Sequence, residues 1–310
     1  MVLESLVSLK EGIKNPWSVF YLSAVVSLVS FVISFLVFKQ DVGLYSVILT
    51  TLGLTPFMTK LNLYEAKKSV SKERKGIIDL LFFYVRDKKS ILKFAGIIAI
   101  PFIIAALIFQ NLEIRFLIAT LYVGFFLLLS LIFFSFYREV VISFVAIFAG
   151  ITLVFSILYI SLPREIAEIT FKTQIDEIKA IRGYFWFGEK FQTILIHNIG
   201  VLFLSFLFSF IYGSGAIFVL AWNASILATA ASMVAKSPYE LPVTLLSYMP
   251  HGSLEIVAYF LGAIAGGIAS FYLIRSNDVK NLLGDTSFLL SLGILFLLLG
   301  AIVETILLMS

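Results

Sequence analysis

Long apolar runs, separated by short charged or turn-forming segments, set the pattern of this chain. A helix that crosses a bilayer needs about 20 mostly apolar residues. Runs of roughly that length fall at residues 17–38, 42–58, 94–110, 116–137, 140–162, 191–211, 214–235, 252–274 and 286–309. They are apolar on every side instead of alternating, which indicates helices and not the strands of a membrane barrel. The expected fold is all-α, a polytopic transmembrane helical bundle of about nine spans with interfacial helices.

Two segments near the N-terminus need separate comment. The run 42–58 is short and contains Gly43, Gly53 and Pro56, so a re-entrant segment is the alternative to a full span. Residues 1–16 mix leucine and isoleucine with lysine and glutamate at helical spacing, which is typical of a helix lying along the membrane surface. The N-terminal membrane region, residues 1–162, is therefore expected to contain about five spans.

Positive charge is concentrated between the second and third runs, in a basic loop at residues 59–93. Its lysines and arginines are Lys60, Lys67, Lys68, Lys72, Arg74, Lys75, Arg86, Lys88, Lys89 and Lys93. Cytoplasmic loops are enriched in these residues, so we expect this loop inside the cell, as a topology determinant on anionic lipid or as a docking surface for a cytoplasmic partner. Counting spans from it places the N-terminus inside, and residues 161–190, residues 236–250 and the C-terminus outside.

An amphipathic segment separates the two halves of the chain. Its apolar positions recur near helical spacing: Ile166, Ile169, Ile175, Ile178 and Ile181. We predict an extracytoplasmic loop with a surface helix at residues 163–190, leading into the next span. A second membrane region of about four spans then occupies residues 191–310.

Composition agrees with a membrane protein and narrows the chemistry. The chain is 60% hydrophobic and only 14% charged, and its mean hydropathy is +1.04, a balance that one water-soluble core cannot hide. We expect a multi-pass protein of the cell (cytoplasmic) membrane. No cysteine is present, which excludes disulfides and thiolate-ligated metals. The basic loop accounts for the net charge of +4, so no nucleic-acid partner is expected.

Polar side chains inside the apolar runs are concentrated in residues 191–275. His197 and Asn198 lie in one run, Asn223 lies in the next, and His251 and Glu255 lie at the start of the third. Groups of this kind are costly inside a membrane, so each needs a partner or a function. With a rise of about 1.5 Å per residue, both histidines and Glu255 fall near one depth on the outer side. We therefore predict one polar site from these five residues.

Three interpretations of the polar site are open. It is an interhelical hydrogen-bond network, a site for a lipid headgroup, an ion or a partner segment, or a site for zinc or another divalent metal made by His197, His251 and Glu255. The sequence contains no HExxH or GxSxG signature, so we expect a non-enzymatic protein without a cofactor, with the metal site as the alternative. Glu304, in the last run, is interpreted as isolated and structural.

Small residues in the same region predict close helix packing. Gly262, Gly266 and Ser270 repeat every four residues on the face that also carries Glu255, and such stripes let helix backbones approach. Packing within one subunit is the leading interpretation, and a homodimer seam is the alternative. Gly213 and Gly215 flank Ser214 and predict a tight turn between two spans.

Several of these features occur together in one order along the chain. They are His197 with Asn198, the Gly213 to Gly215 turn, Asn223, the sequence Pro250, His251, Gly252, and Glu255 followed by a glycine-rich helix. In this combination the chain resembles the SpoIIM, or stage II sporulation protein M, family of multipass membrane proteins over residues 185–310. The resemblance implies a membrane-embedded organiser, since in endospore formers the family member works with secreted peptidoglycan-degrading proteins during engulfment. Residues 1–160 depart from that protein.

The leading functional hypothesis is a non-enzymatic membrane organiser or scaffold that binds a partner protein or a lipid near the outer membrane face. The expected partners are membrane lipid and a membrane or secreted protein. A transporter or lipid translocator, with a polar path through residues 191–275, is the first alternative because polar groups lie on several neighbouring spans. A metal-dependent membrane hydrolase is the third hypothesis.

Overall fold

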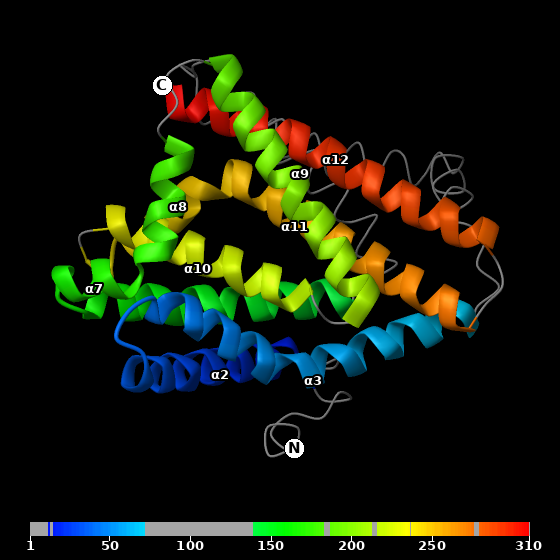
Figure 1. Ribbon diagram of the computed structural model, residues 1–310, viewed down its shortest axis with the longest axis horizontal. Coiled ribbons are helices and arrows are strands. Elements are labelled where there is room, and N and C mark those ends of the chain that lie inside the picture. The colour runs from blue at the N-terminus through cyan, green and yellow to red at the C-terminus, as the bar shows by residue number, and fades with distance from the viewer. Residues whose placement is uncertain are drawn as a thin grey trace, which may run out of the picture.

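The computed structural model describes residues 12, 15–71, 139–182, 187–212, 216–235, 237–275 and 279–309, and every regular element within those ranges is a helix. The helices, in chain order, are α2 (Pro16–Val37), α3 (Val42–Ser71), an unlabelled helix at Glu139–Ser161, α7 (Arg164–Thr170), α8 (Lys172–Arg182), α9 (Phe187–Tyr212), α10 (Ala216–Val234), α11 (Leu241–Arg275) and α12 (Val279–Met309) (Figure 1). The predicted all-α class is confirmed for the described part of the chain.

Seven of the described helices are long and apolar enough to cross a membrane. They are Pro16–Val37, Val42–Leu61, Glu139–Ser161, Gly188–Ile211, Ala216–Val234, His251–Ser270 and Thr286–Ile306. Each coincides with a predicted run to within a few residues. The predicted spans at 94–110 and 116–137, the surface helix at 1–16 and most of the basic loop lie outside the described residues. The total of nine spans therefore stays a prediction.

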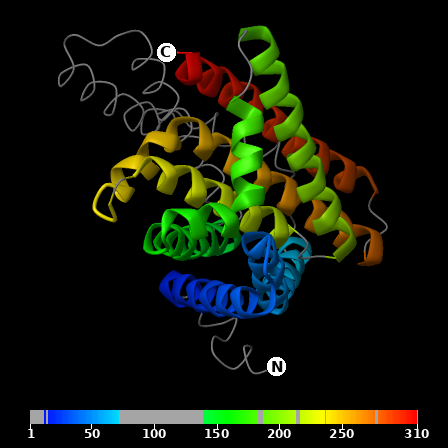
Figure 2. The same ribbon diagram turned by 60° about the vertical axis from the view of Figure 1, so that its left-hand side comes forward.

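The first two helices form a hairpin along one side of the bundle. Pro16 is at the first turn of α2, and the Asn15 side chain accepts a hydrogen bond of 3.1 Å from the backbone nitrogen of Trp17, which caps the helix. Asp41, between α2 and α3, has a φ of 53° and allows the chain to reverse. Figure 2 shows this hairpin on the side of the bundle away from α12.

Helix α3 differs from its prediction in two respects. It is continuous from Val42 through Pro56, which favours a full span over the re-entrant alternative. It also continues to Ser71, which makes the first part of the predicted loop at 59–93 helical. The added turns contain strong helix formers such as Glu65, Ala66 and Lys67, and these favour continuation of the helix beyond the apolar run.

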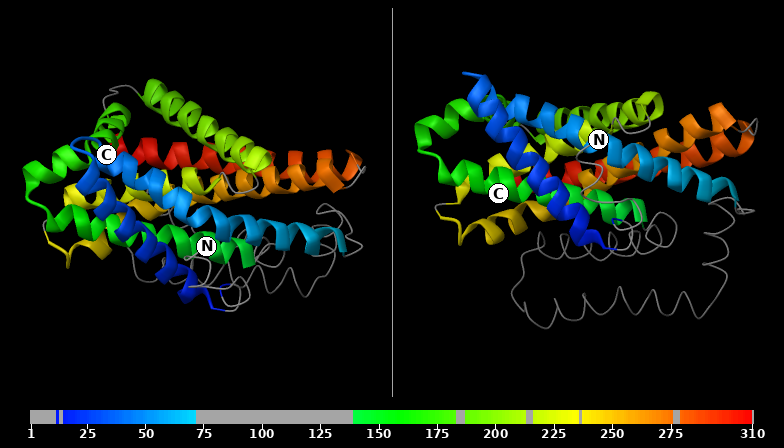
Figure 3. Two further views of the ribbon diagram at one scale, coloured as in Figure 1. Left: turned by 60° about the horizontal axis from the view of Figure 1, so that its bottom comes forward. Right: turned by 90° about the horizontal axis from the view of Figure 1, so that it is seen from below.

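The connections between helices group at two opposite ends of the bundle. One end, which we call the α8 end, holds the α2–α3 loop, α7, the α10–α11 connection and the last turns of α12 (Figures 1 and 3). The opposite end holds the last turns of α9 and α11 and the first turns of α10 and α12. The predicted membrane topology also places residues 161–190 and the C-terminus on one side of the membrane, in agreement with this grouping. Which end faces the cytoplasm stays a prediction.

Helix α11 begins earlier than the sequence pattern indicates. The expected outer loop at 236–250 is only a short connection, because the helix starts at Leu241 and continues through Pro250. The backbone nitrogen of Thr244 donates to the carbonyl oxygen of Glu240 at 3.0 Å, and Pro242 is within the first turn, where proline is tolerated. His251 and Glu255 are therefore in the middle of a long helix, and the prediction that they follow its start is wrong.

Close backbone contacts join α11 to α9 within the chain. A Cβ atom added to Gly262 would lie 2.8 Å from the carbonyl oxygen of Leu202, and one added to Gly266 would overlap the carbonyl oxygen of Phe206. Only hydrogen fits at these positions, so the two glycines set the separation of the helices. Ser270 is half-buried, and Gly213 and Gly215 lie outside the described residues.

We expect Gly266→Ala to lower the free energy of unfolding by about 1–3 kcal/mol, because the added methyl group must push α9 away from α11. The matched control is Gly200→Ala, since a Cβ at Gly200 meets nothing within 4 Å. Reversible unfolding in mixed detergent micelles would measure both. Equal effects of the two substitutions would contradict the packing described here.

Candidate functional site

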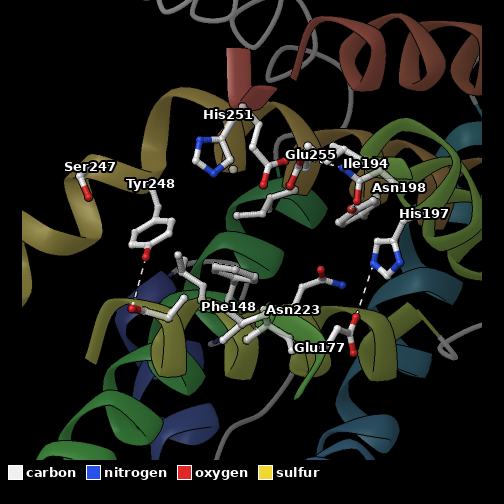
Figure 4. Close-up of a pocket in the computed structure, with 18 residues that line it drawn as sticks. Phe148, Glu177, Ile194, His197, Asn198, Asn223, Ser247, Tyr248, His251 and Glu255 are labelled. Carbon is white, nitrogen blue, oxygen red and sulfur yellow. Dashed lines mark hydrogen bonds and ion pairs between the residues drawn. The ribbon is translucent and has the colours of Figure 1, made fainter. Parts of the chain in front are cut away.

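A pocket lies inside the helix bundle near the α8 end, and the predicted polar residues line it. Its volume is about 310 Å³. The wall is built by side chains from six helices, the Glu139–Ser161 helix, α8, α9, α10, α11 and α12. His197, Asn198, Asn223, His251 and Glu255 all contribute to it (Figure 4). The structure thus brings the five residues of the predicted polar site to one cavity.

Asn198 is the centre of a hydrogen-bonded chain that joins α9 to α11. Its side-chain nitrogen donates to Oε1 of Glu255 at 2.6 Å, and its side-chain oxygen accepts from the hydroxyl of Tyr259 at 2.9 Å. Asn198 is 5% exposed and Tyr259 is 2% exposed, so these bonds lie away from solvent. A hydrogen bond to a carboxylate is stronger than one between neutral groups, which fixes the position of Glu255.

Glu304 lies beside Glu255 and belongs to the same site. It lines the pocket, and its carboxyl group lies next to that of Glu255. Gly300, one turn before it on α12, also packs beside Glu255, because a Cβ there would be in van der Waals contact with Cγ of Glu255 at 3.4 Å. The interpretation of Glu304 as isolated is therefore wrong. Its partner is on another helix, and no spacing within the last run could indicate it.

His197 pairs with a residue that the sequence interpretation did not include. Its Nε2 atom lies 3.5 Å from Oε1 of Glu177 on α8. Figure 4 shows the His197 ring directed toward Glu177, on the other side of the pocket from His251. Among the described residues, no group of three histidine, cysteine or acidic side chains is arranged to hold a metal ion. The trio of His197, His251 and Glu255 therefore does not form the predicted metal site in this structure.

The α8 helix closes one side of the pocket. Its side chains Ile175 and Ile178 are buried, and Nε2 of Gln174 lies 3.4 Å from the Ser225 hydroxyl on α10. The Thr173 hydroxyl donates to the Asp41 side chain at 2.8 Å, which ties α8 to the α2–α3 loop. The predicted surface helix is thus present, but it packs as part of the bundle. This packing explains how Glu177, in a segment of balanced charges, reaches the site.

Two further residues in the pocket wall have polar side-chain atoms that could still form hydrogen bonds. Nδ1 of His251 is buried and has no hydrogen-bond partner among the described residues. Asn223 donates from its side-chain nitrogen to the Val219 carbonyl oxygen at 2.8 Å, and Figure 4 shows its side-chain oxygen directed into the pocket. A buried polar atom without a partner is costly. Both residues would gain from a ligand that supplies the missing contacts.

The remaining wall is apolar and the rim is partly open. The apolar side chains are Phe148, Ile178, Ile194, Ile226, Leu227, Ala230 and Ile256. Ser247, at the rim, is exposed, and the His197 side chain is 39% exposed. Gly252 also faces the pocket, where an added Cβ would meet nothing within 4 Å. A cavity with an apolar side and a few convergent polar groups is the usual form of a site for a small molecule or a lipid.

The comparisons with known proteins identify one family. Residues 172–307 match the family model of SpoIIM, stage II sporulation protein M, which confirms the resemblance for this part of the chain. The matched segment begins at α8, earlier than the expected residue 185, and includes Glu177 and Glu304. Of the pocket residues, Phe148 alone precedes it. No curated protein and no solved structure matches the chain.

We expect Tyr259→Phe to lower the free energy of unfolding by about 0.6–1.5 kcal/mol, because Asn198 then loses a buried donor. Tyr239→Phe is the control, since Tyr239 is 93% exposed. The test is a double-mutant cycle with Asn198→Leu, measured by unfolding in mixed micelles. A coupling energy above about 0.5 kcal/mol is expected, and additive effects would show that the two side chains act independently.

Proposed function

Taking the match to the SpoIIM family over residues 172–307 as the premise, we propose that this protein is a non-enzymatic membrane protein that binds a lipid in the pocket near the α8 end. The observation that carries the proposal is the mixed lining of the pocket. Apolar side chains line it together with the polar groups of Asn198, His251 and Glu255. An amphiphilic molecule, with a polar headgroup and an apolar chain, can contact both kinds of side chain.

The position of the pocket supports a lipid as the ligand. Glu304 is two residues from the end of the apolar span Thr286–Ile306, and His251 begins the span His251–Ser270. Both residues are therefore near the level where a bilayer passes from hydrocarbon to headgroups. With the basic loop inside the cell, this level belongs to the outer leaflet, as the positive-inside rule predicts. A bound lipid at that face would suit an organiser that meets partners outside.

Packing beyond the pocket favours binding over translocation. On the side away from the α8 end, α9 and α11 are in backbone contact at Gly262 and Gly266. A polar path from the pocket to the opposite end along these helices would have to separate them. The geometry therefore best supports a protein that holds a lipid in its pocket and serves as a membrane scaffold. Transport would appear as flux of lipid or solute in sealed vesicles that contain the purified protein.

The test is to fill the pocket without disturbing its wall. Gly252→Phe places an aromatic side chain in open space inside the pocket, so it should reduce lipid retention at least about tenfold while the protein stays folded. Gly200→Phe is the matched control, because Gly200 is exposed and nothing lies near its Cβ position. Native mass spectrometry of both variants, after identical detergent exchange, measures the bound lipid per chain.

Wild type and Gly200→Phe should retain about one lipid per chain, the number that a pocket of 310 Å³ can hold at the headgroup end. Equal retention in Gly252→Phe would mean that the lipid lies elsewhere on the surface. Retention in none of the three proteins would contradict lipid binding itself.

A further inference from the structure

Two polar side-chain atoms face the pocket from different helices and are open to a ligand. Nδ1 of His251, on α11, is buried without a hydrogen-bond partner among the described residues. Asn223, on α10, uses its side-chain nitrogen in the bond to the Val219 carbonyl oxygen, and its side-chain oxygen is directed into the pocket (Figure 4). The hydrogen-bonding needs of these two atoms define the chemistry that a ligand must bring.

The bond to Val219 decides which end of the Asn223 amide faces the pocket. A backbone carbonyl oxygen can only accept, so the amide nitrogen must be the group that donates to it at 2.8 Å. The end that remains for the pocket is the amide oxygen, which is an acceptor. A ligand that bonds to Asn223 therefore needs an O–H or N–H donor.

His251 adds a second requirement. A neutral imidazole carries its proton on one of the two ring nitrogens, so Nδ1 is a donor in one tautomer and an acceptor in the other. A hydroxyl group both donates and accepts, and it therefore completes either tautomer. Because a buried polar atom without a partner is costly, a ligand that supplies this contact gains affinity.

We propose that the pocket recognises the free hydroxyl groups of an uncharged polyol headgroup, so that the lipid it binds is an acylated glycerol or a similar lipid alcohol. This inference rests on the proposed function and names its ligand class. One hydroxyl contacts Nδ1 of His251 and a second donates to the Asn223 oxygen, while the acyl chain lies against Phe148 and Ile226. An uncharged polar end enters a cavity of this kind at a lower desolvation cost than an ion does.

Other headgroups fit the two open atoms less well. An ionised phosphate and a trimethylammonium group contain no donor for the Asn223 oxygen. A primary ammonium group can donate to both atoms when Nδ1 carries no proton, but it has to give up the hydration of a full charge. A pair of hydroxyls meets both requirements without that cost, and the amine is separated from it by experiment.

The experiment compares monooleoylglycerol, which has two free hydroxyls, with its dimethyl ether by native mass spectrometry of the purified full-length protein. The ether keeps the acyl chain and the acceptor oxygens and loses both donors. We expect the diol to bind at least about tenfold more tightly, because the ether leaves the Asn223 oxygen without a donor. Oleylamine, which has an apolar chain of the same length, should bind no more tightly than the ether.

The variants His251→Phe and Asn223→Leu should each lower the ratio of diol to ether affinity severalfold, because each removes one of the two open atoms. Gln192→Leu is the matched control, since it removes an amide that is exposed on α9 and does not line the pocket. A ratio that stays unchanged in both pocket variants would show that the ether is excluded by its bulk, and it would overturn the hydroxyl site.

The lipid series on the wild-type protein keeps the test valid if a variant fails to fold. Equal binding of diol and ether would overturn the hydroxyl site, with water as the partner of these atoms, and would leave the proposed function standing. Tighter binding of oleylamine would overturn it in favour of an ammonium ligand. Binding of free glycerol without retention of monooleoylglycerol would support the hydroxyl site and contradict the lipid, and binding of neither would contradict both.

Discussion

A carboxylate placed inside a membrane protein must be given partners, and Glu255 is the residue where this requirement shapes the structure. Its side chain contacts Asn198 from α9 and Glu304 from α12, while Asn198 is also held by Tyr259, which lies on α11 with Glu255. Three helices must therefore converge within hydrogen-bond distance of one point. An unpaired carboxylate at this position would cost several kcal/mol, which is of the order of the whole stability of a domain.

Small residues make this convergence sterically feasible. Gly262 and Gly266 allow α9 and α11 into backbone contact, and Gly293 on α12 packs against the Leu202 side chain, 3.2 Å from the position of an added Cβ. The helices are close at these points, and they leave a pocket toward the α8 end, where larger side chains and α8 itself form the wall. Small side chains along the helices thus produce the close packing, and larger side chains nearer the α8 end hold the helices apart and leave the pocket.

Much of the fold could be predicted from the sequence, because the bilayer imposes a length and an apolar surface on every spanning helix. The pattern failed where the helix continues past the apolar run, at the end of α3 and the start of α11. At the end of α3, strong helix formers such as Glu65, Ala66 and Lys67 continue the helix, so helix propensity and not hydrophobicity decides that boundary.

The candidate site was only partly predictable. The polar residues of α9, α10 and α11 were evident because each interrupts an apolar run. Glu304 and Glu177 were not assigned to it, since their partners lie on other helices and a single sequence does not show which helices are neighbours. The i, i+4 spacing placed His251 and Glu255 on one face of a helix, but it could not show that His197 is directed toward α8. For this reason the sequence left open the alternative of a metal site, although His197 lies apart from His251 and Glu255.

The central claim is that a lipid occupies the pocket near the α8 end. The most direct measurement is an experimental density map of the protein in nanodiscs that contain phospholipid, with a rigid binding partner added for particle alignment. The account predicts headgroup density beside Asn198, His251 and Glu255, and acyl-chain density along Phe148 and Ile226. A map in which the pocket is empty of lipid, with its apolar side chains closed on one another, would contradict it.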